Sequence, residues 1–334
     1  MARTHRTIGA LACSAALLAA LATGCGKDPD PMADGRVEVA TSSAALASIA
    51  SNVAGTHAHV TAAVPEQDDV HGYEPGAAAR RALAKADLIL LNGMGLDEPV
   101  EDLARDAKRS GVSIVKVGDQ AVPDDQVITT PSEDGDTTNP HAWLDPVLAK
   151  AYVAEVADRL AGLDGGHADD YRKNAAALTK RIDVLDRAAK RSVATIPKKR
   201  RTFLAYHDAM PYLAQRYGLR SLSALQHPDL HKPTAAEVTG TAKVIRSKHV
   251  PAVFGSVEFP SAVPTKLAAA TGATYGGALR DDDLPGAPDE PGHSWLGLVQ
   301  YDLVAIVTAL GGNPAALQAV DTTDVGPTRA SYPQ

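Results

Sequence analysis

The 334-residue sequence predicts an α/β protein in which two parallel-sheet lobes are joined by one long helix. Short runs rich in β-branched residues alternate with helical patterns, which is the order expected of βαβ units and parallel sheets. This alternation occurs twice, and an uninterrupted helical pattern separates the two series. We therefore expect lobes at residues 36–165 and 196–334, with the connecting helix at 166–195.

The first series predicts one parallel sheet. Its strands are expected in VEVAT from Val37, HVTAAV from His59, DLILLN from Asp87 and SIVKV from Ser113. The third of these runs is apolar almost throughout, which is typical of a strand covered on both faces. Helical patterns separate the strands at 44–54, before Ala86 and at 98–109.

The second series follows the connecting helix. Strands are expected in TFLAY from Thr202, PAVFGS from Pro251 and ATYGG from Ala273, with helices at 235–247, 263–271 and 294–310. The connecting stretch 168–193 contains no Pro or Gly, and as one helix it would span about 39 Å. A single long helix between two lobes predicts a stiff hinge. The acidic, turn-rich segment 122–139 is expected to be a surface loop.

The first residues predict export. Basic residues at 3–6 precede an apolar stretch at 8–21, which ends in Ala22-Thr23-Gly24-Cys25. This stretch is shorter than the roughly 20 residues that span a membrane, so residues 1–24 are expected to be a signal peptide. Ala-Thr-Gly-Cys is similar to a bacterial lipobox, although Ala22 stands where Leu is usual, and this implies lipidation of Cys25. The alternative is an ordinary signal cut before an incidental cysteine.

The rest of the composition agrees with an anchored extracytoplasmic protein. Removal of the signal takes away Cys13, so Cys25 is the one cysteine left and no internal disulfide can form. Residues 25–35 are rich in Pro, Asp and Gly and are expected to be a flexible tether. Loss of Arg3 and Arg6 moves the net charge from −7 to −9. This charge argues against a nucleic-acid partner and mildly favours a cation.

Four candidate metal ligands lie where predicted strands end or helices begin. His71 follows the strand that starts at His59, His141 precedes a helix start, His207 closes the Thr202 strand, and Asp282 follows the last strand. Ligands of open α/β sheets bind beyond the carboxyl ends of strands. The successive separations are 70, 66 and 75 residues, so only the fold could bring the four side chains together.

Five motifs then occur in order along the chain: HGYEP from His71, ALAKADLILLNGMG from Ala82, NPHAWLDP from Asn139, YHDAMPYLAQRYGL from Tyr206 and PGHSWLGLVQY from Pro291. Together they resemble the zinc/manganese solute-binding family of ABC importers, a group of metal-binding lipoproteins that includes bacterial adhesins. The resemblance covers essentially the whole mature chain and implies a bilobal metal receptor.

The resemblance also implies the ligand set. In that family the ligands are a histidine in each of the first two motifs, a His or Glu in the third, and an acidic residue near the end. Carried over, these are His71, His141, His207 and Asp282, although the run Asp281–Asp283 leaves the register of the last ligand open. Glu258 matches a frequent family glutamate, and it is expected either to orient an imidazole N–H or to be a surface charge at a helix start.

The expected cargo is one Zn²⁺ or Mn²⁺ ion per chain. Three imidazoles and one carboxylate favour zinc and admit manganese. Manganese members of the family more often have a carboxylate in place of His207, whereas many zinc members carry a histidine-rich loop that is absent here. The resemblance implies that the chain is not an enzyme, acts as a monomer and delivers its ion to an ABC permease. The alternatives are a zinc hydrolase, which would lack the H-E-x-x-H signature, and a surface adhesin.

Other histidines are weaker candidates. His57 and His59 are expected on an exposed face, His227 and His231 could line the mouth of a cleft, and His293 could cap the last long helix.

Overall fold

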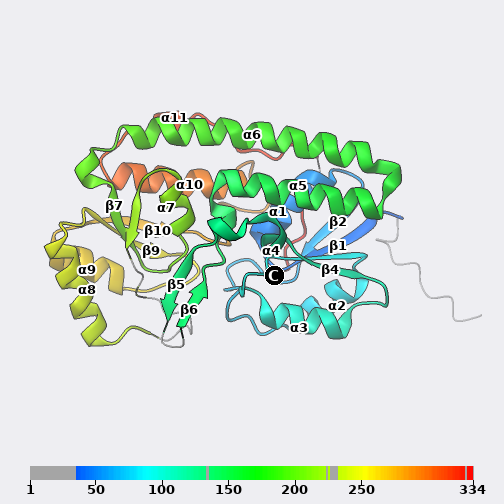
Figure 1. Ribbon diagram of the computed structural model, residues 1–334, viewed down its shortest axis with the longest axis horizontal. Coiled ribbons are helices and arrows are strands. Elements are labelled where there is room, and N and C mark those ends of the chain that lie inside the picture. Colours follow the sequence, from blue (N-terminus) through cyan, green and yellow to red (C-terminus); the bar gives the residue numbers. More distant parts are fainter. Residues whose placement is uncertain (1–34, 133–134, 223–224, 226–231, 328, 334) are drawn as a thin grey trace, which may run out of the picture. The chain divides into compact units, whose positions relative to one another are not determined.

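Two parallel sheets form the frame of the chain from Val37 onward in the computed structural model (Figure 1). The structure describes residues 35–132, 135–222, 225, 232–327 and 329–333. The predicted signal peptide, Cys25 and nearly all of the tether lie outside the described residues, as do His227 and His231.

The first sheet confirms the prediction from the first series. Its strands run in the order β2-β1-β3-β4 and are all parallel. Their bounds are β1 Val37–Thr41, β2 Ala58–Ala62, β3 Leu88–Leu91 and β4 Ser113–Lys116. Helices α1 (Ala44–Ala54), α2 (Ala77–Lys85), α3 (Glu98–Ala107) and α4 (Val117–Ala121) connect or follow these strands. Ser43 caps α1 by accepting a hydrogen bond from the Leu46 N–H, which fixes the turn after β1.

The second sheet has the order β10-β9-β7-β8 and is also parallel. Its strands are β7 Thr202–Ala205, β8 Arg220–Leu222, β9 Ala252–Ser256 and β10 Thr274–Leu279. The helices of this half are α7 Pro211–Arg216, α8 Ala235–Ser247, α9 Val263–Thr271, α10 Trp295–Ala309 and α11 Ala315–Gln318. A capping box between Thr234 and Glu237 starts α8, and Ser294, not His293, caps α10 by accepting from the Gly297 N–H.

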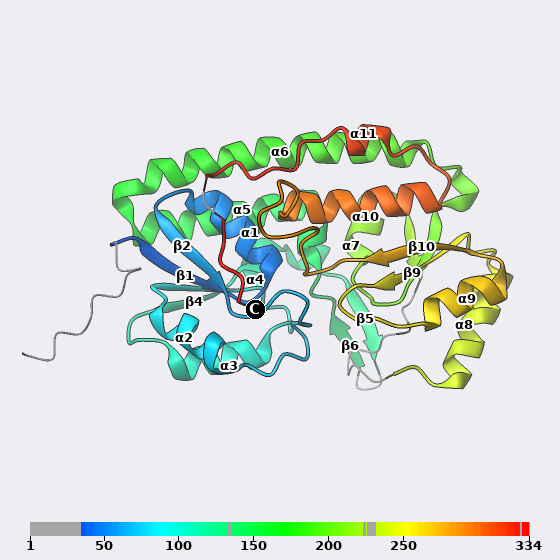
Figure 2. The same ribbon diagram turned by 180° about the vertical axis from the view of Figure 1, so that it is seen from behind.

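The long connecting helix is present as α6, Ala168–Ala194 (Figure 2). Helix α5 (Pro146–Leu163) packs against it, and both helices run alongside the sheets together with α10. Buried residues Tyr171, Leu178 and Leu185 lie seven apart along α6, so one apolar stripe faces the core. The expected two-lobe frame with a connecting helix is therefore confirmed.

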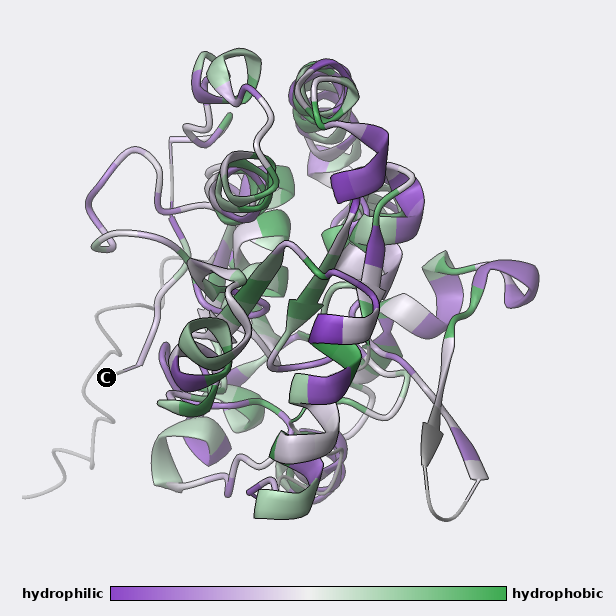
Figure 3. Cartoon of the chain, turned by 90° about the vertical axis from the view of Figure 1, so that its left-hand side faces the viewer, coloured by the Kyte–Doolittle hydropathy of each residue, from purple (hydrophilic) through white to green (hydrophobic). Residues whose placement is uncertain are grey.

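The two sheets are more strongly joined than a single helix requires. Leu90 of β3 and Phe254 of β9 belong to one continuous hydrophobic core. The C-terminal segment also returns to the first sheet, where the Ser331 N–H donates to the Val60 carbonyl and the Ser331 carbonyl accepts from the Ala62 N–H, at 2.8 and 3.0 Å. The chain therefore passes between the two sheets a second time, after its first passage through α6. Figure 3 shows hydrophobic residues concentrated on the sheets and the inward helix faces.

The segment 122–139 differs from the expected loop. It contains a short 3₁₀ helix, η1 (Asp124–Gln126), and an antiparallel hairpin of β5 (Thr129–Ser132) and β6 (Gly135–Thr138). Threonines at 129, 130, 137 and 138 supply the β-branched residues that favour strands, and they pair across the hairpin. Among the described helices, none is both long and apolar enough to cross a membrane.

Candidate metal centre

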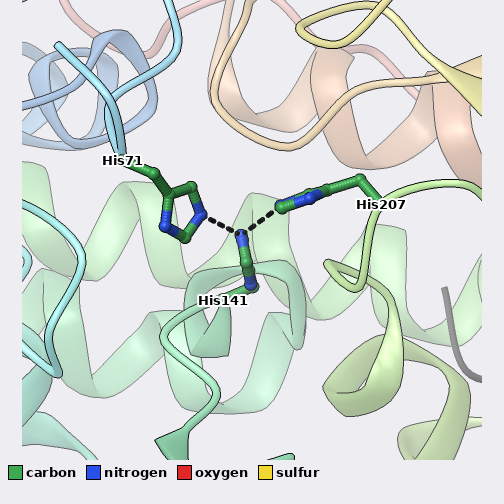
Figure 4. A group of neighbouring side chains, drawn as sticks. All are labelled: His71, His141 and His207. Carbon is green, nitrogen blue, oxygen red and sulfur yellow. Dashed lines mark hydrogen bonds between the residues drawn. The ribbon is translucent and has the colours of Figure 1, made fainter. Parts of the chain in front are cut away.

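Three of the predicted ligands converge on one point (Figure 4). The Nε2 atom of His141 lies 3.3 Å from Nε2 of His71 and 3.1 Å from Nε2 of His207. His71 comes from the loop between β2 and α2. His207 lies two residues after the end of β7 at Ala205. Within the part of the chain that the structure describes, these three form the one cluster of three or more potential metal ligands.

Local turns place two of the histidines. Both carboxylate oxygens of Asp69 accept backbone N–H groups, one from His71 and one from Gly72, at 3.0 Å each. His141 directly precedes the 3₁₀ helix η2 (Ala142–Leu144), and its backbone N–H donates to Asn139 Oδ1 at 3.2 Å. The side chain of Asp145 then caps α5, with Pro146 at the first helical position, so a helix does begin soon after His141 as expected.

The acidic segment after β10 supplies a carboxylate, but from Asp281. Asp281 Oδ2 lies 3.1 Å from His207 Nε2 and 3.6 Å from His141 Nε2. In the described part of the chain, the carboxylate of Asp282 makes no hydrogen bond or ion pair with these imidazoles. The carboxylate in contact is thus one residue earlier than the expected Asp282.

A β-bulge explains why counting residues could not settle this register. The pairing of β10 with β9 shifts between Tyr275 and Ala278. Gly276 and Gly277 lie in the irregular stretch, and Gly277 has a φ of +97°, a conformation that glycine adopts without strain. A bulge adds a residue to one strand and changes which side chain faces the site.

Burial and mutual charge set the ionisation of the site. Burial, reinforced by the neighbouring His141 and His207, holds the pKa of His71 well below its usual value. Burial also lowers the pKa of His141. For Asp281 burial alone would raise the pKa, but the neighbouring imidazoles of His207 and His141 bring it well below the usual range. Neutral imidazoles beside an ionised carboxylate are the protonation states that bind a metal ion.

The spacing of the donors suits a small divalent ion. In a tetrahedral zinc site with bonds of about 2.0–2.1 Å, neighbouring donor atoms lie about 3.3 Å apart. His141 Nε2 lies 3.3 and 3.1 Å from the Nε2 atoms of His71 and His207, and Asp281 Oδ2 lies 3.1 and 3.6 Å from the Nε2 atoms of His207 and His141. These neighbouring separations are close to those of donors that share one small divalent ion.

Glu258 lies beside the site with different partners from those expected. It is buried, and its Oε1 accepts the backbone N–H groups of Asp281 and Asp283 at 3.1 and 3.3 Å. Ser256 Oγ donates to its Oε2 at 3.0 Å. It is neither a surface charge nor, among the described contacts, a partner of an imidazole. Its contacts instead hold the backbone of the aspartate segment.

Two polar groups near the centre were not predicted to have this role. Asn139 contacts His141 through its side chain, and the indole of Trp143 donates to the backbone carbonyl of Asp281 at 2.8 Å. Both residues stand in the NPHAWLDP motif. An amide two residues before a candidate ligand histidine is the signal that could have identified Asn139.

His293 has a separate environment. Its Nε2 lies 2.9 Å from Glu66 Oε1, and its ring packs edge-on against Tyr332. The predicted surface position of His57 is partly correct, because its ring is stacked on His167 at 4.0 Å and pairs with Asp170.

Comparison with known proteins places the chain in a family. Residues 39–309 match the family described as zinc-uptake complex component A, periplasmic. The chain belongs to this family. The match spans both sheets and all four residues that converge at the centre.

Individual relatives agree with this assignment. The manganese-binding lipoprotein MntA of Halalkalibacterium halodurans is 26% identical over 296 residues, which cover 88% of this chain and 96% of MntA. The solved periplasmic zinc-binding protein TroA from Treponema pallidum superimposes with a TM-score of 0.75 at 26% identity, over 83% of this chain and 99% of TroA. A manganese-bound periplasmic metal-binding protein from Candidatus Liberibacter asiaticus gives a TM-score of 0.72 at 27% identity, over 82% and 99% of the two chains.

Proposed function

We propose that this chain is the extracytoplasmic receptor of an ABC metal importer, which captures Zn²⁺ or Mn²⁺ and delivers it to a membrane permease. The observation that carries the proposal is the convergence of three imidazole nitrogens and one carboxylate at spacings that suit a divalent ion. Membership of the zinc-uptake family supports it.

We assign the ligands as His71, His141, His207 and Asp281, with Asp281 in place of the expected Asp282. The first two come from the segment predicted as one lobe at 36–165, and the last two from the segment predicted at 196–334. An ion held by both segments would link them. This arrangement suits a receptor, because a permease could then distinguish the metal-bound form from the metal-free form.

Transport is favoured over zinc hydrolysis by the completeness of the site. His141 and Asp281 are 1% and 2% exposed, and His207 is also buried. Four protein donors fill a tetrahedral zinc site, whereas a catalytic zinc keeps one position for water or substrate. The matched relatives are named for binding metal, which supports the same choice.

Zinc is the preferred cargo. Three nitrogen donors and one oxygen donor suit zinc, whereas manganese favours a larger share of oxygen ligands. The relatives include both zinc-binding and manganese-binding proteins, so we retain manganese as the alternative cargo. Competition between the two ions for the apo protein decides between them.

Metal analysis tests the site. We expect the chain from Gly26 onward, which contains the whole unit from Val37, to bind one zinc ion per chain and to lose it in His141→Ala. The matched control is His249→Asn, which replaces an exposed histidine at positive φ by a residue that tolerates this conformation. Stoichiometric zinc in the His141→Ala variant would reject the assignment.

Anchoring through Cys25 is a further part of the proposal. It is supported by the lipobox-like sequence and by relatives named as lipoproteins. Two acyl chains hold a protein stably at a membrane. In cells, we expect the wild-type chain in the membrane fraction and Cys25→Ala in the soluble fraction. An equal distribution of both proteins would reject anchoring but would leave the metal site standing.

A further inference from the structure

Asn139 occupies a special position between two of the proposed ligand segments. It is 3% exposed and stands two residues before His141. Its Oδ1 accepts the His141 backbone N–H at 3.2 Å and lies 3.1 Å from His141 Nδ1. Its Nδ2 donates to the backbone carbonyl of Asp208 at 2.7 Å. Asp208 directly follows His207 in the chain.

These contacts fix the orientation of the amide. Nδ2 faces the acceptors Asp208 O, at 2.7 Å, and Asp208 Oδ2, at 3.4 Å, while Oδ1 faces a backbone N–H. The reversed amide would place an oxygen against the Asp208 oxygens and an NH₂ group against the His141 N–H. Since Oδ1 is purely an acceptor, the His141 Nδ1 beside it must carry the proton.

The tautomer of His141 follows from this. With the proton on Nδ1, the lone pair of a neutral imidazole is on Nε2. That nitrogen is the atom that lies 3.3 and 3.1 Å from the Nε2 atoms of His71 and His207. The amide thus aims a lone pair at the centre of the donors.

The same side chain also joins the second ligand segment. The Asp208 carboxylate accepts from Thr130 Oγ1 at 2.8 Å, and the Tyr212 hydroxyl donates to the Asn139 carbonyl at 3.1 Å. The hairpin, Asn139 and the segment after β7 therefore form one hydrogen-bonded unit. A displacement of the His207 segment would therefore also displace the Asn139 amide, which orients His141.

We propose that Asn139 is a positioning residue of the metal site, which fixes the tautomer of His141 and couples it to the backbone next to His207. The inference rests on the proposed function, because it requires His141 to be a metal ligand. Partners of this kind typically change metal affinity by about 10–100-fold when they are removed.

Two substitutions distinguish the effect of Asn139 on the His141 tautomer from its coupling to the backbone next to His207. Asn139→Ala removes the hydrogen bonds of the side-chain amide to His141 and to Asp208, and we expect the zinc dissociation constant to rise by about 10–100-fold. Asn139→Asp keeps an acceptor for His141 Nδ1 but cannot donate to the Asp208 carbonyl. We expect it to retain the tautomer and to raise the zinc dissociation constant about tenfold, at the lower end of the same range, through faster release.

The tautomer of His141 is measured by ¹⁵N NMR of the imidazoles in the zinc-free protein. The zinc dissociation constant is measured by chelator competition, and the rate of zinc release by stopped flow. In the wild type and Asn139→Asp, His141 should be the Nδ1–H tautomer, whereas Asn139→Ala should show a mixture. A merely structural role would not change this spectroscopic signature. Asn52→Ala is the matched control, because Asn52 is equally buried and hydrogen-bonded to Ser48, Asp324 and Val325. It should lose stability but keep its zinc affinity.

The outcomes distinguish this inference from the proposed function. If the wild type binds no stoichiometric zinc, or His141→Ala retains it, the proposed function fails and the inference falls with it. If the wild type binds zinc and His141→Ala does not, but Asn139→Ala keeps the wild-type affinity and His141 tautomer, the inference alone is overturned.

Discussion

The indole N–H of Trp143 donates a 2.8 Å hydrogen bond to the backbone carbonyl of Asp281. This contact joins the segment that carries His141 to the segment that carries Asp281, the proposed acidic ligand. The second indole extends the chain of contacts, because Trp295 Nε1 donates to the Trp143 carbonyl at 3.1 Å. The two tryptophans of the sequence thus both lie in the framework of the candidate metal centre.

Trp143 should therefore report metal binding. Its ring lies 5.2 Å from the His141 ring. We expect zinc to change the intrinsic fluorescence of the wild type, and Trp143→Phe to lose most of this change. The variant leaves the buried Asp281 carbonyl without its donor, which should lower the free energy of unfolding by about 1–3 kcal/mol in urea titrations. An unchanged fluorescence response in Trp143→Phe would place the reporter elsewhere.

Glu258 should act through its acceptor oxygens. In Glu258→Gln the amide oxygen can still accept the N–H groups of Asp281 and Asp283, so we expect near-wild-type zinc affinity. Glu258→Ala leaves both buried N–H groups unpaired, at about 1–3 kcal/mol each, and should weaken zinc binding by loosening Asp281. Isothermal titration of the two variants checks this order. Equal affinities in Gln and Ala variants would contradict the role of these hydrogen bonds.

The sheets could be predicted from sequence because burial leaves a strong pattern. The four apolar residues of β3, Leu88–Leu91, are buried, and a central parallel strand requires that run. The helix α6 was predicted for a similar reason, since its stripe of apolar residues recurs without Pro or Gly. Local patterns of this kind need no knowledge of distant partners.

The remaining features depend on contacts between distant residues. Asp281, which lies beside the imidazoles, follows a register shift in β10, and its backbone carbonyl accepts a hydrogen bond from Trp143. The return of Ser331 to the edge of β2 involves one pair of backbone groups that carry no side-chain signature. The hairpin was missed because its exposed, acidic composition is also typical of a loop. Convergence of the three histidines was expected from their places at strand ends and helix starts and from the family motifs, which together distinguished them from the other eight.

The zinc-free protein should lose stability as the pH falls below about 6.5. The folded state lowers the pKa of His71 and His141, whereas the unfolded imidazoles titrate near 6.5. Between these values the unfolded state binds more protons, so acidification favours unfolding. Well above pH 6.5 the two imidazoles are neutral in both the folded and the unfolded state, and this effect vanishes.

Urea titrations of the chelator-treated protein between pH 5 and 7.5 measure this dependence. The variant His71→Ala/His141→Ala should show a shallower decline over the same range, because it lacks both imidazoles. Parallel curves for the two proteins would exclude these histidines as its source. Zinc added to the wild type should raise stability, by about 2.7 kcal/mol at a free concentration one hundred times the dissociation constant.

Asp186 should make the strongest polar contact between the connecting helix and the segment of α7. It is 8% exposed on α6, accepts from Arg216 Nη2 at 3.1 and 3.2 Å, and also accepts from Tyr217 Oη at 3.2 Å and Lys190 Nζ at 2.7 Å. Asp186→Ala leaves the Arg216 guanidinium without this partner, so we expect the free energy of unfolding to fall by about 3 kcal/mol.

The matched control for Asp186 is Lys190→Ala, four residues along the same helix. The Lys190 side chain is 52% exposed, and an exposed pair of this spacing contributes only about 0.3–0.5 kcal/mol. In urea denaturation the two variants should therefore differ in the free energy of unfolding by about 2 kcal/mol, since only Asp186→Ala removes a partner from the half-buried Arg216 and the buried Tyr217. If both substitutions cost the same small amount, the attachment of α6 to the second half must come from its apolar stripe alone, and zinc release should then be insensitive to Asp186→Ala.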